Sequence, residues 1–219
     1  GLEVALKTSQ SPFDDVLVRR AVFYAMDPWQ AIEDIWLGGA FVTLGFPTAE
    51  STWILPQDDM REFIDRPEYA RSLLKQTGVH TPVSVSIKVG DFGELYLAHA
   101  QRIADEMRAV GFDPTLELVN RRVFGDEVWL GGNYQMAIGP TSPVDTPNSY
   151  LLPVLHSQGQ WNTTEHQDKE LDRLIEAQAW EYNTLARKEL IQQIQRRVLD
   201  QAYRFMPATR VSIWTWWPR

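Results

Sequence analysis

The sequence predicts an α/β fold with a mixed sheet and helices packed against it. Two periods alternate along the chain, because apolar residues recur at every second position in some segments and at every third or fourth in others. The middle of the chain predicts strands at 83–89, 115–119 and 134–138 with a helix between each pair, which is typical of layered α/β structure. No internal repeat or low-complexity linker divides residues 1–219, so we expect a single domain.

The first third of the chain predicts one strand followed by helices. Leu2–Thr8 alternates apolar and polar residues, as a half-buried strand does. Asp14 or Asp15 is placed to cap a first helix, and Asp27 with Pro28 is placed to open a second. Gly38-Gly39 ends that second helix, and a third helix begins near Pro67 and ends at Gly78.

Residues 41–57 follow neither period and are rich in glycine, proline and aromatic residues. Phe46 and Trp53 belong to this segment, and aromatic side chains suit stacking on a ligand. A layer that covers the core would have the same composition, so both interpretations stay open. The pair Asp58-Asp59 is read as a turn or a helix cap and not as paired acids in a cleft.

Val83–Val89 is the clearest strand, since Val and Ile alternate with Ser and Lys. Asp91-x-x-Glu94 follows it and matches a capping box, so capping is the favoured role of Asp91 and contact with a ligand is the alternative. Asn120 is a candidate cap for a helix over 122–130. Two helices, near 171–175 and from Thr184, precede an extended apolar segment over 205–217.

The stretch Tyr134–Leu152 organises the chain. A short strand ends at Gly139-Pro140, a loop with prolines follows, and an apolar helical segment begins with Asp145 or Thr146 as its N-cap. Backbone N–H groups and the positive end of a helix both suit such a corner for ligand binding. A plain strand-to-helix connection explains these residues equally well.

Composition excludes several classes of function. A net charge of −8 and a pI near 5.0 argue against a nucleic-acid partner, because phosphates require clustered Lys and Arg. The absence of cysteine excludes disulfides, thiolate catalysis and cysteine-type zinc sites. The four histidines show no metal-ligand spacing, and nothing in the sequence indicates a cofactor. No apolar run reaches the length of a membrane span.

Several motifs, in a consistent order, resemble those of the family 5 extracellular solute-binding proteins. The most specific is Pro12-Phe13-Asp14-Asp15-Val16, continued by Val18-Arg19 and by Tyr24-Ala25-Met26-Asp27. The others are Gly38-Gly39-Ala40, Pro67-Glu68 with Leu73-Leu74, Gly111-Phe112, and Trp161-Asn162 with Lys169–Ile175. The resemblance covers essentially the whole chain.

This resemblance implies a two-lobed periplasmic-binding-protein-like fold, of which residues 1–219 are the second large lobe. The family serves ABC importers of dipeptides, oligopeptides, nickel and opines, so the implied partners are a small solute, ABC permease subunits and the first lobe, which this sequence lacks. The implied location is periplasmic or otherwise extracytoplasmic, and a lipid anchor on the full-length protein is consistent with it. The missing start Met and the apolar C-terminal end agree with a piece of a longer protein.

The resemblance also predicts the ligand-binding residues. Peptide-binding members carry, near the position of Ser142 or Pro143, an Asp that pairs with the α-amino group of the ligand. A buried ammonium requires a paired anion, so the solute expected here is an opine or a sugar conjugate before a free peptide. The predicted ligand-binding residues are Gly139, Thr141, Ser142, Asp145, Asn148, Phe46, Trp53 and Asp91.

An α/β hydrolytic enzyme is the alternative, with Asp145 and a histidine as its reactive groups. No G-x-S-x-G motif supports it, and the binding interpretation assigns no catalytic residue. The two hypotheses differ in a simple respect, since only the enzyme would turn over a substrate.

Overall fold

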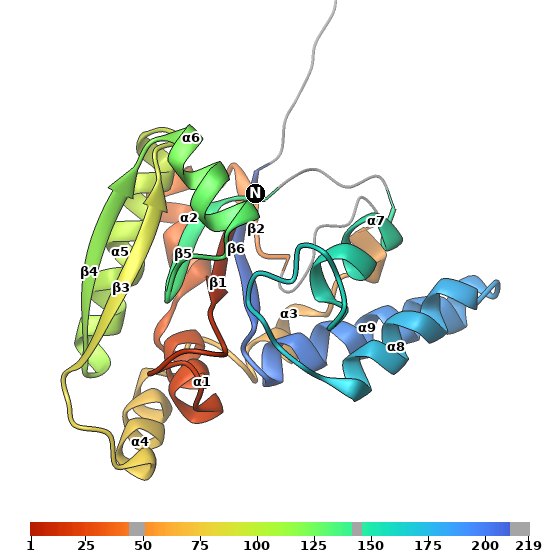
Figure 1. The fold of residues 1–219 in the computed structure, drawn as a ribbon, viewed down its shortest axis with the longest axis horizontal. Coiled ribbons are helices and arrows are strands. Elements are labelled where there is room, and N and C mark those ends of the chain that lie inside the picture. The colour runs from red at the N-terminus through yellow and green to blue at the C-terminus, as the bar shows by residue number, and fades with distance from the viewer. Residues whose placement is uncertain (44–50, 142–145, 211–219) are drawn as a thin grey trace, which may run out of the picture.

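The computed structural model describes residues 1–43, 51–141 and 146–210. These residues form a mixed sheet of six strands in the order β2-β6-β1-β5-β3-β4, with helices on both faces (Figure 1). The expected α/β class is therefore confirmed. The strands are β1 (Leu2–Leu6), β2 (Ala40–Phe41), β3 (Val83–Gly90), β4 (Phe112–Val119), β5 (Met136–Pro140) and β6 (Arg204–Arg210).

Strand direction divides the sheet into two parts. Strand β3 runs parallel to both β4 and β5, whereas β1 runs antiparallel to β5 and β6. The parallel pairs need crossover connections, and helices supply them. Strand β4 begins three residues earlier than predicted, and the strand expected at 134–138 is displaced to Met136–Pro140.

One face of the sheet carries the largest core. Helices α1 (Val16–Ala25), α2 (Pro28–Trp36), α4 (Pro67–Thr77) and α5 (Glu94–Val110) cover it. Local signals set their ends as expected, because Asp15 and Asp27 accept backbone N–H groups of the first turns of α1 and α2. Helix α4 ends at Gly78 and helix α5 at Gly111, each in the left-handed conformation.

The other face meets the remaining elements. The helical turns α6 (Arg121–Phe124) and η2 (Gly125–Leu130) cover β3 and β5, and Asn120 caps them as predicted. A second core joins α7 (Asn148–Tyr150), η3 (Leu151–Leu155), α8 (Lys169–Trp180) and α9 (Thr184–Asp200), which extend to one side of the sheet (Figure 1). The short elements η1 (Ser51–Trp53) and α3 (Gln57–Met60) complete the described chain, and Asp58-Asp59 lies in the first turn of α3.

The structure differs from two of the predicted helix starts. The capping box at Asp91 is wrong, because β3 extends to Gly90 and the N-cap position of α5 is Gly93, which lacks a side chain to bond with. Of the two residues expected to open the helical segment after β5, Asp145 lies outside the described residues. Pro147 holds the N-cap position of α7, and the Thr146 hydroxyl accepts the N–H of Ser149 at 3.4 Å.

Candidate functional site

The carboxyl ends of the parallel strands meet at one edge of the sheet. Gly90 at the end of β3 lies opposite Val119 at the end of β4, and β5 runs in the same direction beside β3. The residues that follow are Asp91, Asn120 and Thr141. Ligands of open α/β sheets bind beyond this edge, because loops and exposed backbone groups gather there.

Both flanking antiparallel strands reach the same edge. Leu2 in β1 lies opposite Pro140 in β5, and the N–H of Thr141 donates to the carbonyl of Gly1 at 3.1 Å. Leu2 also lies opposite Ala208, so β6 ends at this edge too. The chain's first residue, the start of the 141–148 loop and the end of β6 are therefore neighbours (Figure 1).

Asp91 is an exposed residue at this edge. Its N–H donates to the carbonyl of Val119 at 2.9 Å, and its own carbonyl accepts the Nε–H of Arg121 at 3.3 Å. Among the residues the structure describes, none bonds to the Asp91 carboxylate. Gly93, rather than Asp91, holds the N-cap position of α5, so the Asp91 carboxylate does not cap that helix.

Gly139 lies where the ring of Phe124 rests on the sheet. A Cβ at Gly139 would lie 2.3 Å from Cζ of Phe124, and a Cβ at Gly90 would lie 2.9 Å from its Cδ2. The ring of Phe124 thus leaves no room for a side chain at Gly139, and at Gly90 the ring of Phe92, with Cε2 2.5 Å from the added Cβ, comes closer still. The sequence showed Gly139 as a strand end, and its packing role emerges only from the position of Phe124.

Phe124 belongs to an aromatic cluster beside this edge. Its ring centroid lies 5.6 Å from that of Phe92 and 5.5 Å from that of Trp129. The guanidinium of Arg121 lies 5.4 Å from the Phe92 centroid, within the range of a cation–π contact. The cluster fixes the turn after β3 against α6, and no sequence motif indicated it.

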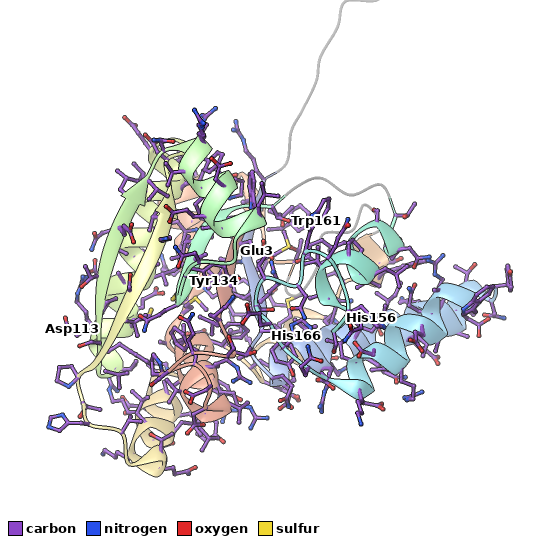
Figure 2. All side chains as sticks on the ribbon, in the orientation of Figure 1. Glu3, Asp113, Tyr134, His156, Trp161 and His166 are labelled. Carbon is purple, nitrogen blue, oxygen red and sulfur yellow. The ribbon has the colours of Figure 1, made fainter. Side chains whose placement is uncertain are left out.

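A buried polar network lies beside Gly139, because Glu3 is its partner in the neighbouring strand β1. The network joins β1 to α7 and β6 (Figure 2). One carboxylate oxygen of Glu3 accepts hydrogen bonds from the Tyr150 hydroxyl and from Nη1 of Arg204, both at 2.9 Å. Nη2 of Arg204 donates to the hydroxyl of Thr163 at 2.8 Å, and that hydroxyl lies 3.0 Å from the hydroxyl of Tyr134.

The pKa values of Arg204, Tyr134 and Tyr150 are all raised, so the guanidinium stays charged and the two phenols stay neutral at pH 7. Burial acts to lower the pKa of Arg204, but the Glu3 carboxylate and the two tyrosines raise it above its ordinary value. Burial, then the Glu3 charge, raises the pKa of Tyr150 well above its ordinary value. Sequence reasoning missed Glu3 and Arg204 entirely, because a polar residue in an alternating strand is ordinarily read as facing solvent.

The remaining predicted ligand residues fall into two groups. Phe46, Ser142 and Asp145 lie outside the described residues. Asn148 lies at the far end of the loop, where its Oδ1 accepts from Nε2 of Gln178 at 2.6 Å. That bond ties the start of α7 to α8 and orients the amide of Asn148.

Trp53 packs on the helical core beside α9. Its carbonyl accepts from Nε2 of Gln195 at 2.8 Å, and the guanidinium of Arg187 lies 5.8 Å from its ring. These contacts favour the covering role over the ligand role for Trp53. The ligand role remains a prediction.

His166 has structural partners in the core. His166 is buried and stacks on Tyr203 with centroids 4.3 Å apart, while its Nδ1 and Nε2 lie 2.7 Å from the Thr164 hydroxyl and the Leu155 carbonyl. Burial lowers the pKa of His166 to about 4, so the ring is neutral at pH 7. Within the described ranges, no group of three or more histidines and acids is placed to hold a metal ion.

A wide groove lies beside β2, the outermost strand next to β6. It has a volume of about 850 Å³ and walls from α2, β2, α3 and α9, and it is lined by none of the predicted ligand residues that the structure describes. Arg61, stacked 3.9 Å from the Trp29 centroid, forms part of its wall. A much smaller cavity of about 20 Å³ lies between Trp129, Gly139, Pro140, Thr163 and Arg204.

We find no helix in the described ranges that is long and apolar enough to cross a bilayer.

The fold agrees with that of solved solute-binding proteins. It superposes on the ABC transporter substrate-binding protein CtaP of Listeria monocytogenes with a TM-score of 0.83 at 17% identity, covering 95% of this chain and 43% of CtaP. It also superposes on the oligopeptide-binding protein AppA of Bacillus subtilis, solved with a nonapeptide, with a TM-score of 0.80 at 15% identity, covering 93% of this chain and 44% of AppA.

Sequence comparison identifies the family. Residues 3–162 match the family described as bacterial extracellular solute-binding proteins, family 5 middle, and the chain belongs to that family. It is 26% identical over 208 residues to heme-binding protein A of Haemophilus influenzae, covering 91% of this chain and 37% of that protein. This chain therefore spans less than half the length of these relatives.

Family membership decides between the two functional hypotheses. Members of this family are solute-binding components of importers and not enzymes, so the hydrolase interpretation is not favoured. The family is extracellular by description, which agrees with the expected extracytoplasmic location.

Proposed function

We propose that residues 1–219 are the second large lobe of a two-lobed protein that captures a small solute and delivers it to the permease subunits of an ABC importer. The sheet edge at Asp91, Gly139 and Thr141 is this lobe's half of the ligand site, and the rest of the 141–148 loop completes it. The first lobe supplies the opposite wall, and closure of the two lobes encloses the solute. A lipid anchor on the full-length protein would keep it near the permease.

The observation that carries this proposal is the convergence of parallel strand ends at that edge. None of the described residues bonds to the carboxylate of Asp91. The loop after β5 begins at the same edge, where the Thr141 N–H donates to the carbonyl of Gly1. The large groove beside α2 and α3 offers more volume. Its walls, however, are not strand ends of the parallel part of the sheet.

Ligand class follows from the residues of the loop. Thr141 and Ser142 offer hydroxyls where peptide-binding members are expected to place an acid. An ammonium group buried beside these two hydroxyls would lack a counter-charge at that position, and Asp91 or Asp145 would have to take over the contact from elsewhere in the site. The favoured solute therefore presents hydroxyls, carboxylates or phosphates, as an opine or a sugar conjugate does. The names heme-binding protein A and oligopeptide-binding protein AppA show that relatives of this fold take different ligands.

A thermal-shift screen of the full-length protein tests this proposal. The panel holds trialanine, its N-acetylated form, an opine and a sugar phosphate. We expect an opine or sugar phosphate to raise the melting temperature most, and Ser142→Asp to shift the preference toward trialanine by about tenfold or more in affinity, because the new carboxylate pairs with the ammonium.

N-acetyl-trialanine is the matched control, since it has the same backbone without the charge. Ser142→Asp should not improve its binding. Largest stabilisation of the unmodified protein by trialanine would refute the ligand class, and no response to any solute class would count against solute capture itself.

A further inference from the structure

The small cavity of about 20 Å³ lies on the face of the sheet that α6 and η2 cover. Its wall contains side chains from the neighbouring strands β5, β1 and β6. Ala5 in β1 lies opposite both Ala137 in β5 and Arg204 in β6, so the three side chains form a row on one face of the sheet. Two members of this row are alanines, which leaves room for the cavity.

One nitrogen of Arg204 has no protein partner. The side chain is 7% exposed, and its Nη1 and Nη2 donate to Glu3 and Thr163. Its Nε is also buried, and no hydrogen-bond partner for it exists among the residues that the structure describes. A buried N–H of a charged group is costly to leave unpaired, so we expect Nε to have an acceptor that the described residues do not supply.

The hydroxyls of Tyr134 and Thr163 supply a second donor in need of an acceptor. They lie 3.0 Å apart, and both residues line the cavity. The bond between them uses one of their two hydroxyl hydrogens, whereas Nη2 of Arg204 only donates to Thr163. The other hydroxyl hydrogen therefore has no acceptor within the described ranges, whichever of the two residues carries it.

The volume and the polarity of the cavity indicate what fills it. About 10–15 Å³ is enough for one water molecule, and cavities that stay dry have apolar walls. This cavity is slightly larger than that minimum, and four polar side chains contribute to its wall, those of Glu3, Tyr134, Thr163 and Arg204. A carboxylate or phosphate group of a solute has several heavy atoms and does not fit.

We propose that the cavity is a binding site for a single water molecule, which accepts hydrogen bonds from Nε of Arg204 and from the Tyr134–Thr163 pair. The carboxylate of Glu3 also lines the cavity and can accept from the water in return. The water thus completes the hydrogen bonding of the buried ion pair between β1 and β6. This inference goes beyond the proposed function and does not depend on it.

Two variants of equal shape test the proposal in solution. Ala5→Thr and Ala5→Val each place a branched side chain in the cavity and displace the water, but only threonine brings an oxygen that can accept in its place. We expect the unfolding equilibrium constant of the full-length protein to be about tenfold larger for Ala5→Val, because valine leaves Nε of Arg204 buried without an acceptor. Chemical denaturation measures both constants, and any steric cost is common to the two variants.

Val4 provides the matched control in the same strand. It is fully buried and belongs to the apolar core on the opposite face of the sheet. Val4→Thr places a hydroxyl in apolar surroundings and should raise the unfolding equilibrium constant by about tenfold or more. Threonine is thus expected to be the more stable choice at position 5 and valine at position 4. Equal stability of the two Ala5 variants, or a more stable Ala5→Val, would overturn the proposal.

A crystal structure of the full-length protein, at a resolution that shows ordered waters, locates the ligand directly. We expect one peak of density in the cavity at about 2.7–3.2 Å from Nε of Arg204. Crystals grown with bromide distinguish water from a halide ion, because bromide scatters X-rays anomalously. We expect no anomalous signal there, since the Glu3 carboxylate repels an anion. Bromide in the cavity, or no peak at hydrogen-bonding distance from Nε, would contradict the proposal.

Discussion

Arg204→Met is expected to lower the free energy of unfolding by about 3–5 kcal/mol, because it leaves the Glu3 carboxylate buried without its cation. The charge of Glu3 has no other arginine or lysine partner among the described residues. Loss of Nη2 also frees the Thr163 hydroxyl from its donor. Chemical denaturation of the unmodified protein and of Arg204→Met, monitored by tryptophan fluorescence, measures the difference in the free energy of unfolding.

Two further variants make this result specific. Arg196→Met breaks the ion pair of Arg196 with Asp59, in which both side chains are at least one-third exposed, and it should cost less than about 1 kcal/mol. Adding Glu3→Leu to Arg204→Met removes the uncompensated charge and should restore more than half of the lost stability. A loss as small as that of Arg196→Met would show that the buried pair is not as tightly coupled as its geometry indicates.

Gly139→Ala is expected to lower the free energy of unfolding by about 3 kcal/mol, because the new methyl group meets the ring of Phe124. The ring is fully buried and is held by Phe92 and Trp129, so it cannot move aside without disturbing the cluster. The same denaturation experiment measures the change. Proton chemical shifts of the Trp129 ring report whether the cluster has moved.

Gly125→Ala is the control for this substitution. It adds the same methyl group in a helical backbone, where the nearest atom is 3.7 Å away on Trp129, so stability should stay the same or rise by about 0.5–1 kcal/mol. Replacing the ring by a smaller side chain in Phe124→Leu should reduce the loss of unfolding free energy that Gly139→Ala causes. If Gly139→Ala were neutral, Phe124 would not lie against the strand as described.

Local signals were enough to predict most of the fold. Val83–Val89 alternates so regularly that its strand was predicted to within one residue, and Asp15, Asp27 and Asn120 cap the helices they precede. Asp91 was misassigned as a cap because its spacing to Glu94 fits a capping box. The N–H of Asp91 instead donates to the carbonyl of Val119, so Asp91 continues the hydrogen bonding between β3 and β4.

The candidate site depends on contacts that no local pattern records. Glu3 follows an alternating pattern that predicts exposure, yet β1 is buried along its whole length. Leu2, Val4 and Leu6 belong to the core on one face, and Ala5 belongs to the core on the other. The packing of Phe124 on Gly90 and Gly139 joins three separate segments. Sequence motifs could identify the loop after β5, but the pairing of Glu3 with Arg204 required the fold.

The central claim is that the solute binds at the carboxyl ends of the parallel strands. Amide hydrogen exchange of the full-length protein, with and without the solute that raises its melting temperature most, tests this claim most directly. We expect slower exchange at 90–92, 120–122 and 139–149 on binding, because lobe closure removes the sheet edge from water. Exchange at 52–61, beside the large groove, should stay the same. Protection confined to the groove, with the strand ends unaffected, would contradict the account.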